Sequence, residues 1–220
     1  MMDFARLRQQ FVDNQVRPSE VTDRELVNAI LSVPREMFVE PSERPFAYSD
    51  LEIPMSDAAP DRRMIDPVQL ARLLQALSVD PESKAMVVGC GTGYSAALLA
   101  RIAGSVIAVE DDEQLAARAA DNLRSLSAAN AKVVRAPLAE GHPGEAPYDA
   151  ILVDGAVEFV PEALIGQLKP GGQLAVIERE ERISRAMLYE RFDDGASKWP
   201  QFEAWATLLP GFERPREFVF

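Results

Sequence analysis

The sequence predicts an α/β fold: a doubly wound, mostly parallel, seven-stranded sheet of the Rossmann-like type, preceded by an N-terminal helical cap. From residue 84 onward, short apolar strands alternate with helical segments. These strands lack polar alternation, as expected when helices cover both faces of a sheet. In addition, the glycine-rich turn GCGTG over 89–93 joins the first of these strands to an alanine-rich helical segment. Strand, glycine turn and helix in this order are typical of parallel sheets that bind a ligand at their strand ends.

Composition predicts one globular unit and narrows the choice of partners. The chain has 220 residues, of which 47% are hydrophobic, and its net charge of −12 argues against nucleic acid and anionic membranes. No apolar run approaches the roughly 18–20 residues that span a bilayer, so we expect a cytoplasmic protein. The single cysteine, Cys90, and the single histidine, His142, cannot form a zinc cluster, and we expect no metal.

The first eighty residues are predicted to form a helical cap and a substrate-side loop, with the ligand-binding domain over 81–220. RELVNAILSV has helical apolar spacing, and the stretch over 34–66, which holds five prolines, is expected to be an irregular cover for a site. Asp66 and Pro67 then indicate a helix start, with Asp66 as the capping residue.

The remaining elements follow in order. We expect strands at AMVVG, SVIAVE, AKVVR, YDAILVD and QLAVIE, separated by helices at YSAALLARIA, EQLAARAADNLRSL and PEALIGQL. The segment over 184–220, from SRAMLYERF to EFVF, is predicted to add antiparallel strands separated by the turn DDGASKWP.

The glycine turn predicts a shelf for a ligand, because a side chain at Gly89, Gly91 or Gly93 would fill the space beneath it. A dinucleotide motif would place its third glycine where this chain has Tyr94, so the spacing favours a nucleoside without a pyrophosphate. Glu110, at the end of the next strand, is placed to accept hydrogen bonds from ribose hydroxyls. Together with the KPGG turn over 169–172, these features favour S-adenosylmethionine over a nicotinamide cofactor; a purely structural turn is the alternative.

Three further segments, VPREMFV, AYSDLEIP and APYDAI, occur in this order around the glycine loop. With them the chain resembles the protein-L-isoaspartate O-methyltransferase family from about residue 24 to 180. The resemblance implies a class I methyltransferase fold, S-adenosylmethionine as methyl donor, and a peptide or protein carboxylate as substrate. That carboxylate would be the α-carboxylate of an isoaspartyl residue in a damaged protein, whose methyl ester cyclises and reopens as aspartate.

The acceptor loop departs from the pattern G-Q-T-I-S-x-P that the resemblance implies. Its hydroxyl positions fall on Arg63 and Ile65, or on Asp66 with a one-residue gap, and these are the positions matching the catalytic loop. Arg62 and Arg63 are the candidate substrate-binding residues, because a guanidinium matches a carboxylate bidentately. The alternative is that both arginines are solvated or paired with nearby aspartates.

The donor site departs as well. The acids implied before the first glycine and in the family's G-D-G segment fall on Val87 and Pro137, and two lost hydrogen bonds would weaken donor binding about a hundredfold. The expected cofactor-binding positions are Gly89, Cys90, Gly91, Gly93, Tyr94, Glu110, Pro137, Leu138 and Asp154.

Two other functions stay open. The first is a weak or inactive methyltransferase-like binding protein whose site has lost its hydroxyls. The second is a metal-dependent small-molecule O-methyltransferase, suggested by Asp154 at a strand end. Tyr48 and Tyr94 either face the donor sulfonium through a cation–π contact or belong to the core.

Overall fold

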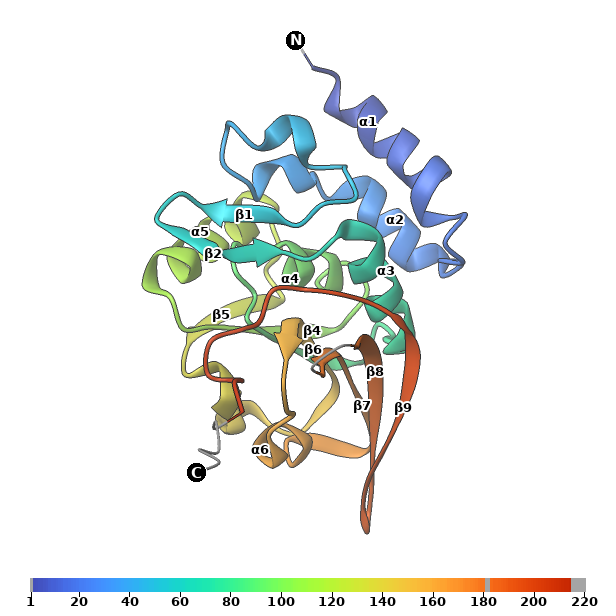
Figure 1. Cartoon of the computed structure of the whole chain (residues 1–220), viewed down its shortest axis with the longest axis vertical. Coiled ribbons are helices and arrows are strands. Elements are labelled where there is room, and N and C mark those ends of the chain that lie inside the picture. Colours follow the sequence, from blue (N-terminus) through green and yellow to red (C-terminus); the bar gives the residue numbers. More distant parts are fainter. Residues whose placement is uncertain (1, 181–182, 215–220) are drawn as a thin grey trace, which may run out of the picture.

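The computed structural model describes residues 2–180 and 183–214. Its main sheet has seven strands in the order β5-β4-β3-β6-β7-β8-β9 (Figure 1). The neighbouring strands from β5 through β4, β3 and β6 to β7 pair in parallel, whereas the β7–β8 and β8–β9 pairs are antiparallel. The strands are β3 (Lys84–Val88), β4 (Ser105–Glu110), β5 (Ala131–Arg135), β6 (Tyr148–Val157), β7 (Leu168–Arg179), β8 (Ser184–Phe192) and β9 (Gly195–Glu203). The predicted doubly wound, mostly parallel sheet is confirmed.

Helices cover the sheet on both faces, and the side chains of β3 show how the two cores divide. Ala85 and Val87 belong to one hydrophobic cluster, whereas Met86 and Val88 belong to the other, because successive strand residues point to opposite faces. The helices are α1 (Phe4–Phe11), α2 (Arg24–Ser32), α3 (Pro67–Ala76), α4 (Tyr94–Leu99), α5 (Glu113–Ser125) and α6 (Glu162–Ile165). A π-helical turn over Val12–Val16 and short 3₁₀ turns over Arg35–Met37, Arg44–Phe46, Leu138–Glu140 and Pro143–Glu145 complete them.

The sequence predicts that the stretch over 34–66 is irregular throughout. The structure shows instead that it contains a second, two-stranded sheet. Strands β1 (Ile53–Ser56) and β2 (Ala59–Met64) form an antiparallel hairpin in which Ile53 pairs with Met64. Both of these side chains and Met55 are buried, so the hairpin is held by its packing on the main domain. In Figure 1 it lies across the end of the main sheet.

The C-terminal prediction needs two corrections. The turn between β8 and β9 is confined to Asp193 and Asp194, because Gly195 already pairs with Phe192 and the rest of the predicted turn belongs to β9. After β9 the chain leaves the sheet and crosses back over it (Figure 1). It meets β6 at Ala156, which forms a bridge with Leu208, and Leu209 packs against Gly155. The expected strand at EFVF lies outside the described residues.

The parallel strands bring their carboxyl ends to one edge of the sheet, beneath the hairpin. Val88 pairs with Val109 on one side and with Val153 on the other. The next residues along the three strands are the glycine loop, Glu110 and Asp154, which therefore lie at one level of this edge.

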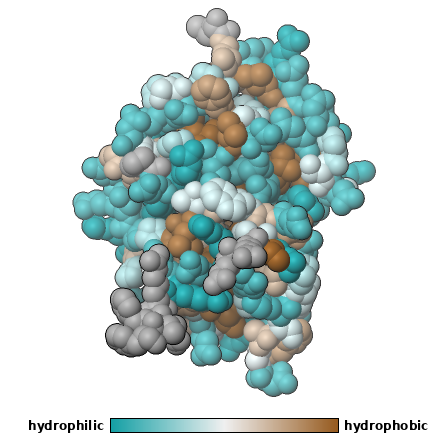
Figure 2. All heavy atoms as spheres, viewed as in Figure 1, coloured by the Kyte–Doolittle hydropathy of each residue, from teal (hydrophilic) through white to brown (hydrophobic). Residues whose placement is uncertain are grey.

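The visible surface is mainly hydrophilic. In Figure 2 hydrophobic residues form small, separate patches on a predominantly hydrophilic face. Within residues 2–180 and 183–214, no helix combines the length and apolarity needed to cross a bilayer.

Candidate cofactor and substrate site

The glycine loop follows β3 and opens α4. Gly91 and Gly93 have φ values of +54° and +95°, which residues with a side chain rarely adopt. A Cβ atom at Gly93 would also lie 3.2 Å from the Cβ atom of Ala119 in α5. The loop is therefore fixed by backbone conformation and close packing, and the N–H groups of Gly89 and Cys90 donate to the carbonyl oxygen of Val109 at 2.9 and 3.1 Å.

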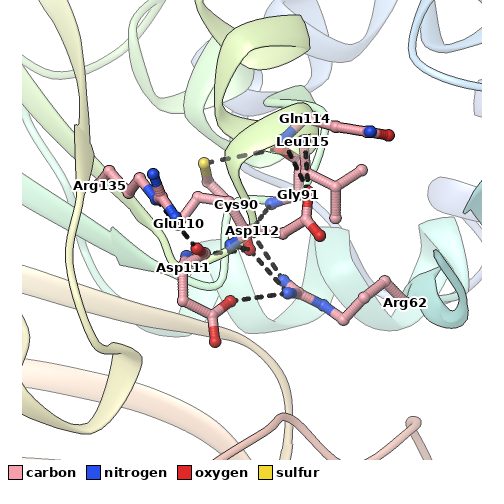
Figure 3. A network of polar contacts seen from close by, with 9 residues as sticks. All are labelled: Arg62, Cys90, Gly91, Glu110, Asp111, Asp112, Gln114, Leu115 and Arg135. Carbon is pink, nitrogen blue, oxygen red and sulfur yellow. Dashed lines mark hydrogen bonds and ion pairs between the residues drawn. The ribbon is translucent and has the colours of Figure 1, made fainter. Parts of the chain in front are cut away.

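Glu110 is the electrostatic centre of this edge (Figure 3). Its buried carboxylate accepts a 2.6 Å hydrogen bond from the backbone N–H of Gly91. The backbone N–H groups of Asp111 and Asp112 donate to the Oε1 atom at 3.1 and 3.2 Å. Glu110, which the sequence predicts to bind the ribose, thus lies beside the glycine loop.

Arg62 of β2 closes the remaining side of Glu110. Its Nη1 and Nη2 atoms donate to the two carboxylate oxygens at 2.6 and 2.7 Å, and Nη1 also contacts Asp111 at 3.0 Å (Figure 3). Burial raises the pKa of Glu110, although the positive charge of Arg62 opposes that rise. Arg62 therefore occupies both carboxylate oxygens of Glu110, the group that the sequence predicts to bind the ribose hydroxyls.

Met55 of β1 fills the shelf itself. A Cβ atom at Gly91 would lie 2.0 Å from its sulfur, which means that the methionine rests directly on the glycine. Arg118 of α5 holds the backbone of β1, since it donates to the carbonyl oxygen of Met55 at 2.9 Å and to that of Val39 at 2.7 Å. The hairpin is thus fastened over the loop.

The C-terminal segment packs against the loop from another direction. Methyl groups of Leu209 lie 3.0 and 3.1 Å from where a Cβ atom of Gly89 would be, and Leu138 lies 3.7 Å from it. Leu138 therefore lies beside the loop, and Pro137 precedes it as the N-cap of a 3₁₀ turn. Neither Pro137 nor Val87 supplies an acid to this edge.

A small cavity of about 10 Å³ lies under the hairpin, with Arg35, Tyr94 and Asp154 in its wall. The Nη2 atom of Arg35 donates to the carbonyl oxygen of Ile65 at 2.7 Å, and the guanidinium lies 4.8 Å from the centre of the Tyr94 ring. Ser95 donates a hydrogen bond to the Oδ2 atom of Asp154. Burial raises the pKa of Asp154 to about 6, while the Ser95 hydrogen bond and the Arg35 charge oppose the rise.

The acceptor-loop positions have backbone partners. Arg63 donates to the carbonyl oxygen of Glu52 at 2.7 Å, and Asp66 caps α3 by accepting from the N–H groups of Val68 and Gln69, as predicted for that residue. Ile65 is buried in the cavity wall. No side-chain hydroxyl occupies these three positions.

Tyr48 and Cys90, which the sequence analysis considered for the donor site, make structural contacts. The hydroxyl of Tyr48 donates to Glu36 at 2.5 Å and accepts from Arg8 at 2.8 Å, within the N-terminal cap. Cys90 is buried, and burial raises the pKa of its thiol well above the usual value, so it is held as a neutral thiol.

Sequence reasoning did not single out Arg35, Ser95 or Met55. Arg35 carried a signal, because it and Glu36 are charged residues inside the otherwise apolar segment VPREMFV. Ser95 and Met55 carried none, since their roles depend on contacts with distant elements.

Comparison with known proteins agrees with this architecture. Residues 6–205 match the family model described as protein-L-isoaspartate(D-aspartate) O-methyltransferase. A protein-L-isoaspartate O-methyltransferase from Koribacter versatilis (strain Ellin345) is 38% identical over 175 residues, covering 79% of this chain and 77% of the relative. A solved protein-L-isoaspartate O-methyltransferase superposes with a TM-score of 0.81 at 25% identity, covering 95% of this chain and 66% of that longer chain.

A second solved structure, from Plasmodium falciparum, is described as the same kind of methyltransferase in complex with S-adenosyl-L-homocysteine. Its TM-score is 0.75 at 20% identity, and the match covers 95% of this chain and 99% of that one, so it supports the fold.

The fold and the match to this family model define a class I methyltransferase that uses S-adenosylmethionine. With the family model covering most of its length, the chain belongs to the protein-L-isoaspartate(D-aspartate) O-methyltransferase family.

The residues present fit the donor chemically. Glu110 suits the ribose hydroxyls, Gly91 permits close approach of the ligand, and a buried oxygen of Asp154 lacks a partner among the described residues. The space is filled by Met55 and Arg62, which must withdraw for the donor to enter. In the part of the chain that the structure describes, no three His, Cys, Asp or Glu side chains cluster in a way that could hold a metal ion.

Proposed function

We propose that this protein transfers a methyl group from S-adenosylmethionine to the α-carboxylate of isoaspartyl residues in damaged proteins, in the cytoplasm. The observation that carries the proposal is the carboxylate of Glu110 held against the Gly91 N–H at the carboxyl end of the sheet. In the proposal, residues 81–220 bind the donor and residues 1–80 cover the acceptor side.

The chemistry needs no general base. A carboxylate is ionised at neutral pH, and one of its oxygens attacks the methyl carbon in line with the sulfur. The new C–O bond forms as the C–S bond breaks, and the bonding electron pair stays on sulfur, which leaves neutral S-adenosylhomocysteine and a methyl ester. The chain's own work is therefore to align the two reactants and to exclude water, which buried walls such as Tyr94 and Ile65 can do.

The test is methyl transfer from labelled S-adenosylmethionine to a peptide containing isoaspartate, with the aspartate peptide of the same sequence as the control. The proposal expects base-labile label in the isoaspartate peptide alone. Equal labelling of both peptides, or of neither while the protein binds the donor, would contradict the proposed acceptor.

A second function is favoured by the contacts that fill the shelf. Arg62 satisfies both oxygens of Glu110, and Met55 covers Gly91, so the domain is complete without a ligand. A non-catalytic binding relative would keep this closed arrangement. It would be folded, would not bind S-adenosylmethionine at millimolar concentration, and would transfer no methyl group.

A further inference from the structure

The cavity beneath the hairpin contains two buried charges of opposite sign, Arg35 and Asp154. The Nε and Nη1 atoms of Arg35 and the Oδ1 atom of Asp154 have no hydrogen-bond partner among the described residues. Buried polar atoms are ordinarily paired, because an unpaired one has lost its bonds to water without replacement. Free donors and a free acceptor around one cavity therefore indicate a ligand that carries both an anionic and a cationic group.

The position of Asp154 relative to Glu110 narrows the choice of ligand. Strand β3 lies between β4 and β6, and Val88 pairs with the residues that precede Glu110 and Asp154. The two acids thus flank the glycine loop two strand spacings apart, about 10 Å at the usual distance between strands. A ligand with a ribose at one end and a charged tail at the other spans such a separation.

We infer that this cavity receives the α-amino acid end of S-adenosylmethionine, with Asp154 accepting hydrogen bonds from the α-ammonium group and Arg35 donating to the α-carboxylate. The inference rests on the proposed function and extends it. In this assignment Asp154 provides the acidic group that the family resemblance implies at position 87, where this chain has a valine. Ser95 holds the other oxygen of Asp154 and so fixes the orientation of its carboxylate.

The closed cavity is too small for this ligand. At about 10 Å³ it has room for roughly one water molecule. Met55 and Met64 of the hairpin line it, so the amino acid end enters only when the hairpin withdraws. The competing explanation is structural: Arg35 and Asp154 act only as opposite charges that stabilise each other in the closed protein.

Two ligands separate these explanations. S-Adenosylhomocysteine carries the amino acid end, whereas 5′-methylthioadenosine has the same nucleoside without it. The dissociation constants of both are measured by calorimetry for the wild type and for Asp154→Asn. Asp149→Asn is the matched control, because Asp149 lies at the opposite end of β6, where it pairs with Lys169.

We expect Asp154→Asn to weaken binding of S-adenosylhomocysteine about 10- to 100-fold, the effect of losing one charged hydrogen bond, and to leave binding of methylthioadenosine unchanged. Asp149→Asn should change neither. Equal effects of Asp154→Asn on both ligands, or no effect on either, would overturn the inference while the proposed function stands. Failure of the wild type to bind either ligand would overturn both. Arg35→Met gives a second readout, with the same selective loss expected.

Discussion

The guanidinium of Arg62 makes a bidentate ion pair with the buried carboxylate of Glu110, at 2.6 and 2.7 Å. The two residues are 48 positions apart in the sequence and come from different sheets. Because Glu110 is the residue proposed to bind the donor ribose, its ion pair with Arg62 links the stability of the closed protein to the affinity for the donor.

Removing the arginine should separate these two effects. Arg62→Ala leaves the charge of Glu110 buried without its partner, and should destabilise the protein by about 3–5 kcal/mol without ligand. The donor no longer competes with a guanidinium, so S-adenosylhomocysteine should raise the melting temperature of this variant more than that of the wild type. Thermal unfolding with and without ligand measures both quantities.

Arg63→Ala is the control for Arg62→Ala, because it removes the neighbouring arginine of the same strand. Arg63 makes a single hydrogen bond to the carbonyl oxygen of Glu52, so its loss should cost about 0.5–1.5 kcal/mol. The ligand-induced shift should stay at the wild-type value. If both variants gave the same shift, Arg62 would not compete with the donor.

Removing Met55, which covers Gly91, should have the same two effects as removing Arg62: lower stability and stronger donor binding. Met55→Ala should cost about 2–5 kcal/mol of stability, as large-to-small changes of buried side chains do, and should tighten donor binding because the shelf is opened. Met86→Ala is the control. Met86 of β3 is equally buried, but its side chain belongs to the hydrophobic cluster on the other face of the main sheet from the cluster that contains Met55. It should lower stability comparably and leave donor affinity unchanged, as isothermal calorimetry will show.

Asp154 should make stability depend on pH. Its pKa is about 6 in the folded protein and about 3.9 in an unfolded chain, so burial destabilises the folded state as the pH rises from about 4 to 6. Asp154→Asn lacks this effect. Its free energy of unfolding relative to the wild type should rise by up to about 3 kcal/mol across that window and then stay level. Urea unfolding at successive pH values measures the difference, and a constant difference would contradict the assigned pKa.

The acceptor loop can be tested by restoring a hydroxyl. Ile65→Ser should destabilise the protein by about 2–5 kcal/mol, because Ile65 is buried. It should also increase methyl transfer to the isoaspartyl peptide if the missing hydroxyl limits the rate. Ile65→Ala, which makes a similar cavity without the hydroxyl, is the control. Equal rates for the two variants would exclude a role for the hydroxyl.

Most of the main sheet could be predicted because its signals are local. Apolar strands such as AMVVG and helices with regular spacing identify themselves within a few residues, and Asp66 caps a helix that starts at Pro67. The hairpin β1–β2 escaped prediction because it contains Pro54 and Pro60 and the charged run DRR, which suit a strand poorly. It exists through its packing on the main domain.

Only the part of the candidate site that contains the glycine loop and Glu110 could be predicted from the sequence. Spacing from the glycine loop located Glu110, because strand length fixes where the next strand ends. Nothing local predicts that Arg62 would reach Glu110, or that Arg35 and Asp154 would share a cavity, since these pairs form only when the topology brings distant strands and turns together.

Calorimetric titration with S-adenosylhomocysteine tests donor binding at this edge most directly. One-to-one binding by the wild type, weakened at least about tenfold in a folded Glu110→Gln variant, is the expected result, because the glutamine cannot accept from both ribose hydroxyls as a carboxylate does. No heat, together with no rise in melting temperature at millimolar ligand, would contradict donor binding and would favour the closed, non-catalytic relative.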